Sequence, residues 1–162
     1  MGSNPAKNKG DNLPVEKVTW TECQDIIKKL NELTGKNFRL PTALEWVYAA
    51  RGGSKSSGYK YSGSNKLSEV AWFDSNSKDK THPVGTKMPN ELGLYDMSGN
   101  ACEWTTESWH YSSGSTGNDD WTIRGGYYSA GADEEYGCTY VRDFKYGTTS
   151  DCRGLRSLLY VK

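Results

Sequence analysis

FRLPTALEWVYAARGG, at residues 38–53, is the most informative segment of the sequence. Thr42 and Glu45 form a T-x-x-E capping box, in which each side chain accepts a hydrogen bond from the backbone N–H of the other residue. Two glycines at 52–53 follow where a helix should end. The segment therefore predicts a short amphipathic helix that begins after Thr42. Its inner face is predicted to consist of Leu44, Val47 and Ala50.

A second capping box lies N-terminal to this segment, at Thr19 and Glu22. Apolar residues at helical spacing follow it as far as Gly35, which suits a helix C-cap. This apolar stripe is Cys23, Ile26, Ile27, Leu30 and Leu33. Residues 1–12 are polar and predict an extended or frayed lead-in, and the lack of an apolar run in residues 1–17 argues against a signal peptide.

C-terminal to residue 53 the sequence is rich in turns. Residues 53–87 predict a long ordered loop with short strands, which aromatic packing or a bound ion must hold in place. Residues 107–120 predict an exposed loop. Alternating apolar residues at 121–124 and 154–161 predict strands.

The composition fits one loop-rich domain that spans residues 1–162. Its 11 Tyr and 6 Trp supply large apolar areas for a core, and its 18 Gly indicate many turns. The 20 basic residues balance the 20 acidic ones without a basic stripe, so no nucleic-acid partner is expected. No apolar run reaches the length of a membrane span, so no membrane insertion is expected.

Five motifs occur in a fixed order along the chain: LPVEKVTW at 13–20, FRLPTALEWVYAARGG at 38–53, THPVGTKMPNELGLYDMSGNACEW at 81–104, RGG at 124–126 and GLR at 154–156. Together they resemble the formylglycine-generating-enzyme, or sulfatase-modifying-factor, family over roughly residues 13–160. The resemblance implies an α+β, C-type-lectin-like fold. Two short helices are expected on a small twisted antiparallel sheet, with long loops between the elements.

The resemblance also implies a structural calcium ion at the turn DMSGNACE. Asp96 and Glu103 would give side-chain oxygens, and Gly99 and Ala101 would give backbone carbonyls, which are ligands that calcium prefers. The alternative is an ordinary turn in which the two acids cap backbone N–H groups. The second calcium ion of the family is not expected, because Val70 stands where an Asn ligand would be.

Catalysis in the family requires two cysteines that bind copper. Cys138 matches the second of them, but Asp133 stands five residues earlier, where the first is expected. One thiolate cannot form a two-sulfur copper(I) site, so neither copper nor formylglycine synthesis is expected. The alternative is a metal-dependent oxidase with an altered copper site that uses Cys152. The sequence also leaves open a disulfide between Cys138 and Cys152.

Iron chemistry, which other branches of the family use, requires a histidine cluster. The chain has two histidines, His82 and His110. His82 lies in the loop motif THPVG and is expected to be a loop residue, and His110 alone is weak support for a ligand site.

Residues 127–153 depart most from the family pattern and are rich in Tyr, Ser, Gly, Asp and Thr. These types are frequent in evolved binding surfaces, because tyrosine gives a large contact area at a low entropic cost. The segment resembles the diversified C-terminal region of variable proteins from diversity-generating retroelements, which use a lectin-type fold as a scaffold. The alternative is an ordinary loop of a divergent family member.

The resulting interpretation is a non-catalytic domain that binds a protein ligand through this segment. It would belong to a larger protein on a bacterial cell surface or a phage particle. The predicted ligand-binding residues are Tyr127, Tyr128, Ser129, Tyr136, Thr139, Tyr140, Asp143, Phe144 and Tyr146.

Overall fold

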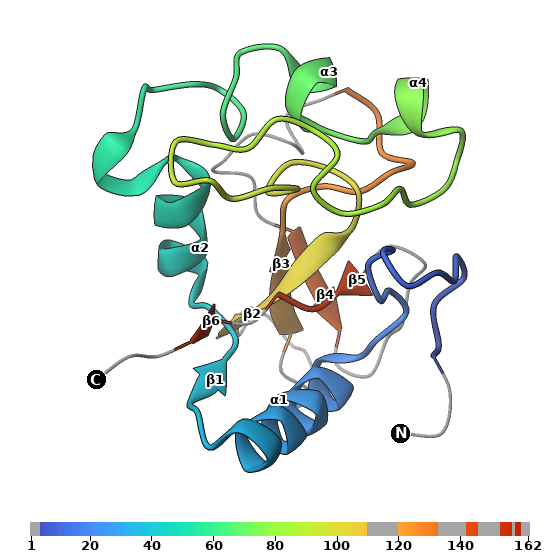
Figure 1. Cartoon of the computed structure of the whole chain (residues 1–162), viewed down its shortest axis with the longest axis vertical. Helices are drawn as coiled ribbons and strands as arrows, with labels where there is room; N and C mark the ends of the chain where they lie inside the picture. The colour runs from blue at the N-terminus through green and yellow to red at the C-terminus, as the bar shows by residue number, and fades with distance from the viewer. Residues whose placement is uncertain (1–3, 110–119, 133–141, 146–152, 157, 160–162) are drawn as a thin grey trace.

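The computed structural model describes residues 4–109, 120–132, 142–145, 153–156 and 158–159. Figure 1 shows a central sheet, a long helix below it, a shorter helix beside it and a layer of loops above it. The helices are α1 (Trp20–Thr34), α2 (Ala43–Ala50), the single turns α3 (Leu67–Val70) and α4 (Asp74–Ser77), and the 3-10 turn η1 (Gly53–Lys55). The fold is therefore of the predicted α+β class. None of the helices in these ranges has the length and apolar character of a membrane span.

Four strands make the central sheet in the order β4 (Arg142–Lys145), β3 (Asp120–Arg124), β2 (Cys102–Trp109) and β5 (Arg153–Gly154). β3 is antiparallel to β2 and β4, whereas β5 is parallel to β2. A separate two-stranded sheet pairs β1 (Phe38–Arg39) with β6 (Leu158–Leu159). The strand predicted over 154–161 was therefore wrong as one element, because its two ends pair in different sheets.

Helix α1 begins at the predicted capping box, where the Thr19 side chain accepts from the Glu22 N–H at 3.1 Å. It ends at Gly35, whose φ of 67° is the left-handed conformation that glycine adopts without strain. Cys23 and Ile27 are buried against the sheet. Leu33 was predicted on the same stripe but is 85% exposed, because it lies at the last turn beyond the reach of the core.

Helix α2 also begins at its predicted box, with the Glu45 carboxylate accepting from the Thr42 N–H at 2.9 Å. Its predicted inner face was wrong at Leu44, which is 80% exposed. The buried residues are Ala43, Trp46 and Ala50. The Trp46 indole sets this rotation, because its N–H donates to the Glu103 carboxylate inside the molecule.

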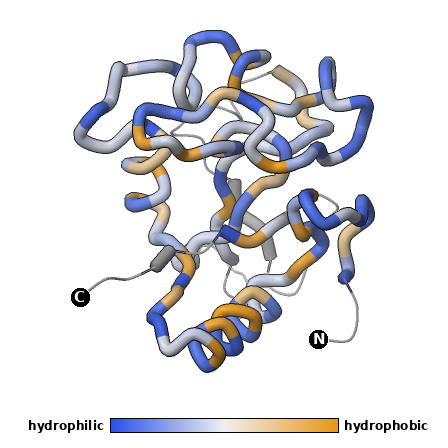
Figure 2. The backbone as a smooth tube through the Cα atoms, viewed as in Figure 1, coloured by the Kyte–Doolittle hydropathy of each residue, from blue (hydrophilic) through white to orange (hydrophobic). Residues whose placement is uncertain are grey.

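The layer of loops is held in place by its own hydrophobic cluster, as predicted for aromatic packing. The cluster consists of Tyr61, Leu67, Val70, Ala71, Phe73 and Ala130. Its secondary structure differs from the prediction, since the regular elements of residues 53–87 are short helices and a single bridge between Tyr61 and Ser64. Figure 2 shows hydrophilic colour along much of the outer edge of this layer.

The polar lead-in is anchored rather than frayed over its described part. Glu16 is fully buried, and its carboxylate accepts from the backbone N–H groups of Lys7 and Asn8 at 3.2 and 3.0 Å. The Val84 N–H also donates to the Asn12 carbonyl. The N-terminal segment is therefore fixed against the loop that carries Val84.

Candidate ligand-binding site

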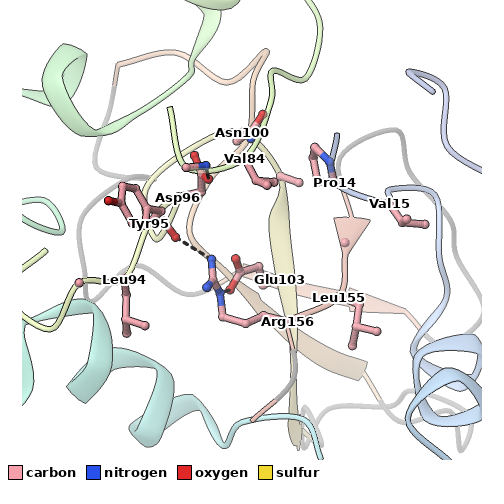
Figure 3. Close-up of a pocket in the computed structure, with 14 residues that line it drawn as sticks. Pro14, Val15, Val84, Leu94, Tyr95, Asp96, Asn100, Glu103, Leu155 and Arg156 are labelled. Carbon is pink, nitrogen blue, oxygen red and sulfur yellow. Dashed lines mark hydrogen bonds and ion pairs between the residues drawn. The ribbon is translucent and has the colours of Figure 1, made fainter. Parts of the chain in front are cut away.

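A cavity of about 520 Å³ opens between the N-terminal segment, the loop 84–96 and the adjoining ends of β2 and β5 (Figure 3). Its charged residues are Asp96, Glu103 and Arg156, and they come from two of the motifs noted in the sequence, 81–104 and 154–156. Its apolar wall includes Val15, Val84, Leu94, Tyr95 and Leu155. The volume is in the range of small-molecule sites in proteins.

Glu103 is the point at which these motifs meet. One of its oxygens, Oε2, accepts from the Trp46 indole N–H and from Arg156 Nε, each at 2.7 Å. The same guanidinium donates through Nη2 to the Tyr95 carbonyl at 2.8 Å. Glu103 is 6% exposed, so this ion pair is shielded from bulk water. The Glu103 charge is thus neutralised within the site.

Asp96 is in a different situation. Its Oδ2 accepts from the Gly85 N–H at 2.7 Å, but its Oδ1 is buried and has no hydrogen-bond partner within the described ranges. Burial, with the nearby charge of Glu103, raises the pKa of the Asp96 carboxyl, against the opposing effects of the Gly85 N–H, Arg156 and the Asn100 side chain. Its φ of 56° is left-handed, a conformation that non-glycine residues rarely adopt. Such a costly arrangement is typical of a functional position.

The turn between these two acids requires its glycine. A side chain at Gly99 would place Cβ 2.4 Å from the Trp72 carbonyl oxygen, at a φ of 79°. The Gly99 N–H donates to the carbonyl of Gly125, the central residue of the RGG motif, at 2.6 Å. Gly125 itself lies against the Trp46 ring. Motifs that lie far apart in the sequence therefore meet in one compact junction beside the cavity.

The four predicted calcium ligands fit an ion only in part. Asp96 offers an unengaged buried oxygen, but Glu103 already binds Arg156, and a guanidinium beside the turn repels a second cation. Within the described ranges no three His, Cys, Asp or Glu residues cluster as metal ligands. Calcium wants six to eight oxygens. Calcium at Asp96, Gly99, Ala101 and Glu103 thus stays a prediction.

The residues predicted to bind a protein ligand are placed unevenly. Ser129 is exposed and Tyr127 is half-buried, whereas Tyr128 is 2% exposed and does not fit a binding surface. Tyr128 is buried because the backbone after Gly126 turns back into the core, where its N–H donates to the Asn100 carbonyl. Asp143 and Phe144 lie in β4, paired with Thr122 and Trp121. Tyr136, Thr139, Tyr140 and Tyr146 lie outside the described residues.

The two cysteines in the described ranges belong to the core. Cys23 and Cys102 are both buried and pack in the cluster beneath the sheet. Burial and the neighbouring Glu22 raise the pKa of Cys23 to about 12, so its thiol is protonated at neutral pH. Asp133, Cys138, Cys152 and His110, which bear on the copper and iron hypotheses, lie outside the described residues.

His82 has a structural place in the loop layer. Its ring stacks on Trp72 with a centroid distance of 3.8 Å, and its Nε2 lies 2.7 Å from the Ser77 carbonyl oxygen. It therefore supports the loop, as expected for a loop residue.

Arg156 is the site residue that was missed in the sequence. It was visible as the last residue of the GLR motif, but nothing in the sequence assigned its partners. The pairing with Glu103 joins residues 53 positions apart and depends on the parallel contact of β5 with β2.

The mixed sheet, the two capped helices and the long loops define a domain of the C-type-lectin-like, formylglycine-generating-enzyme-like class. The chain belongs to the family described as the sulfatase-modifying factor enzyme 1-like domain, whose model matches residues 1–159.

Curated relatives carry different functional names. Chaperone protein LppX of Paenibacillus barcinonensis is 36% identical, over 78% of this chain and 62% of its own length. The formylglycine-generating enzyme of Mus musculus is 30% identical, over 72% of this chain and 36% of its own length. Inactive C-alpha-formylglycine-generating enzyme 2 of Bos taurus is also 30% identical, over 60% of this chain and 34% of its own length. The chain thus spans less than two thirds of each.

Two solved structures match nearly the whole chain. Treponema denticola variable protein 1 has a TM-score of 0.83 and 26% identity, over 97% of this chain and 77% of that one. CarF has the same TM-score and identity, over 98% of this chain and 71% of that one. The chain thus resembles a variable protein in its fold, as well as the formylglycine-generating enzymes in its sequence.

Proposed function

We propose that this chain is a non-catalytic domain that binds a protein ligand through the segment of residues 127–153. The observation that carries the proposal is that this Tyr-, Ser- and Asp-rich segment lies between two family motifs that are fixed in the structure. On one side the RGG motif is built into the core at Gly125, and on the other the GLR motif is built into the ion pair at Arg156. The fold therefore holds both ends while the sequence between them departs from the family.

The frame that carries the segment is well packed. Trp20 of α1 stacks on Trp121 of β3, with ring centroids 3.7 Å apart. The hydroxyls of Thr105 and Thr122 are bonded to each other across β2 and β3, and both residues are fully buried. A rigid scaffold of this kind supports changes in a binding segment without loss of the fold.

The composition of the segment favours a protein partner. Aromatic anchors within a polar surround are characteristic of protein interfaces. Tyr128 is buried in the core and is left out of the proposed surface. The proposed binding residues are Tyr127, Ser129, Tyr136, Thr139, Tyr140, Asp143, Phe144 and Tyr146. The likeness to Treponema denticola variable protein 1 supports the finer proposal of a retroelement-diversified variable protein, borne on a bacterial surface or a phage particle.

We propose that the chain is not catalytic because Asp133 stands where the family has the first of its two copper-binding cysteines, while Cys138 matches the second. A relative whose own name includes the word inactive is compatible with such a loss. Titration with copper(I) tests it, with Cys138→Ser as the control. We expect no tight, stoichiometric binding of copper(I) by the wild-type chain. Tight binding that requires Cys138 and Cys152 would favour the oxidase alternative.

The proposed binding surface is tested by a Tyr140→Ser/Phe144→Ser double variant in a pull-down with the purified domain. The matched control is Tyr48→Ser, a tyrosine on α2 that is 60% exposed. We expect the wild type and the control to retain the same partner and the double variant to lose it with an unchanged melting temperature. An unfolded double variant would place both residues in the core and contradict the proposal.

A further inference from the structure

A second cavity, of about 390 Å³, lies between the N-terminal segment and the loop that follows α4. In Figure 1 the N-terminal segment, in dark blue, lies below this loop. The lining residues come from 7–13 and from 80–83, and none of the described lining residues belongs to the turn 96–103 or to residues 127–153. The cavity is therefore separate from the site of Figure 3 and from the proposed protein-binding segment.

Both walls of this cavity are fixed by buried side chains. On one side, Glu16 is fully buried, and its carboxylate accepts from the Lys7 and Asn8 N–H groups. On the other side, Asn100 is 1% exposed and binds both backbone groups of His82. Its side chain accepts from the His82 N–H at 2.9 Å and donates to the His82 carbonyl at 3.0 Å. A cavity with walls fixed in this way is largely formed before a ligand arrives.

The charge of the lining is positive. Lys9 and Lys80 are exposed at the cavity, one from each wall, and neither forms an ion pair within the described ranges. Lys7 also lines the cavity. Asp11 and Asp79 lie in the same two segments but are not among the described residues that line it. The lining therefore attracts an anion.

A buried hydrogen-bonding group is part of the same lining. Thr81 is 3% exposed, and its hydroxyl has no hydrogen-bond partner within the described ranges. A buried hydroxyl without a partner costs free energy, which a ligand oxygen would recover. Together with the ammonium groups of Lys9 and Lys80, this hydroxyl offers donors from both walls. Such a set suits a ligand with several acceptor oxygens.

These donors favour a phosphate monoester over a carboxylate. A phosphate monoester carries a charge of about −1.5 to −2 at neutral pH, which the two lysine charges match, and its three terminal oxygens can accept from three donors at once. Leu13 is half-buried and Pro83 is exposed, and both line the cavity. They offer an apolar contact to the group that carries the phosphate, as is usual in small-molecule sites.

We propose that this cavity binds a small organic phosphate monoester. Lys9, Lys80 and Thr81 bind the phosphate, and Leu13 and Pro83 contact the organic group. This site is independent of the proposed protein-binding surface.

The probes are phenyl phosphate, phenol and inorganic phosphate, each titrated into the full chain while the amide shifts of residues 7–13 and 80–82 are followed by NMR. Phenol keeps the ring and removes the charge, whereas inorganic phosphate keeps the charge and removes the ring. We expect phenyl phosphate to bind at least about tenfold more tightly than phenol, because hydrogen bonds to a charged group are lost with the phosphate. It should also bind more tightly than inorganic phosphate.

The variant that tests the charges is Lys9→Gln/Lys80→Gln. The matched control is Lys36→Gln/Lys55→Gln, which makes the same change in net charge at two exposed lysines that do not line the cavity. We expect the first variant to weaken phenyl phosphate binding at least about tenfold and the control to bind like the wild type.

The variant that tests the hydroxyl is Thr81→Val. Valine has nearly the same shape, and the hydroxyl bonds no other described residue, so the melting temperature should not fall. We expect phenyl phosphate binding to weaken at least about threefold, because one hydrogen bond to the phosphate is lost. A clear fall in the melting temperature would mean that the hydroxyl has a partner within the fold, and would contradict its place in the site.

Three further results would overturn the proposal. Equal binding of phenyl phosphate and phenol, which requires no variant, would remove the phosphate from the account. Equal loss in both lysine variants would reduce the effect to net charge. Inorganic phosphate that binds as tightly as phenyl phosphate would remove the organic group. Tyr140→Ser/Phe144→Ser should retain the phosphate site, so failure here is distinguishable from failure of the proposed protein-binding surface.

Discussion

Glu103 shows how much one residue contributes when several motifs meet at it. Its carboxylate joins Trp46 of α2, Arg156 beside β5 and the floor of the cavity. Removing one partner of a buried ion pair leaves the other charge uncompensated, which costs about 3–5 kcal/mol. The motifs EW, CEW and GLR are therefore parts of one structural unit, although they lie far apart in the sequence.

At the residue scale, the boundary between the buried core and the proposed binding surface falls between Tyr128, which is buried, and Ser129, which is exposed. Tyr128→Ser should lower the free energy of unfolding by about 3 kcal/mol, because a fully buried aromatic ring is lost from the core. Ser129→Ala should change it by less than about 0.5 kcal/mol, because the residue is exposed. Urea unfolding measures both. Equal effects would contradict the boundary drawn between these neighbours.

At the scale of elements, the two main helices were predictable because their signals are local. Thr19 with Glu22 and Thr42 with Glu45 are capping boxes in the structure as in the sequence. The inner face of α2 was not predictable in full, because Trp46 is turned inward by a partner on β2. Residues 67–77 were predicted as loop with strands, since helices of four residues carry almost no periodicity.

The Glu45 carboxylate gives α2 a pH dependence. Its hydrogen bond from Arg39, with those from Thr42, lowers its pKa to about 2, below the ordinary value of 4.5. An acid with a depressed folded pKa stabilises the protein above pH 4.5 and loses that contribution as the pH falls toward 2. Because the side chain is 41% exposed, the contribution should stay below about 1 kcal/mol.

Replacing Glu45 by Gln tests this dependence. The difference in unfolding free energy between the wild type and Glu45→Gln should be largest near pH 6 and should shrink toward pH 2. Urea unfolding at several pH values measures it. A constant difference across that range would mean that the charge of Glu45 does not contribute.

At the scale of the whole molecule, the sequence predicted the family and the α+β fold because its motifs are long and specific. The cavity was only half predictable. Asp96 and Glu103 were identified as chemically important, but the sequence did not show that only Glu103 pairs with Arg156. That ion pair depends on the parallel pairing of β5 with β2. Such contacts between distant segments leave no local pattern in a single sequence.

The core position of Cys23 and Cys102 predicts how the thiols of the folded protein react. In a Cys138→Ser/Cys152→Ser variant the remaining thiols should react with DTNB only on unfolding, because both are buried and the pKa of Cys23 is about 12. Absorbance at 412 nm follows the reaction in buffer and in denaturant. Fast reaction of the native variant would contradict the packing of α1 on the sheet.

The buried Glu16 ties the residues upstream of the family motifs to the rest of the domain. Its carboxylate accepts backbone N–H groups from Lys7 and Asn8 and a side-chain N–H from Asn8. A shortened chain that started at Leu13, where the family motifs begin, would keep every motif and yet leave the buried Glu16 carboxyl without the donors of Lys7 and Asn8. The polar residues 4–12 are thus a structural part of the domain.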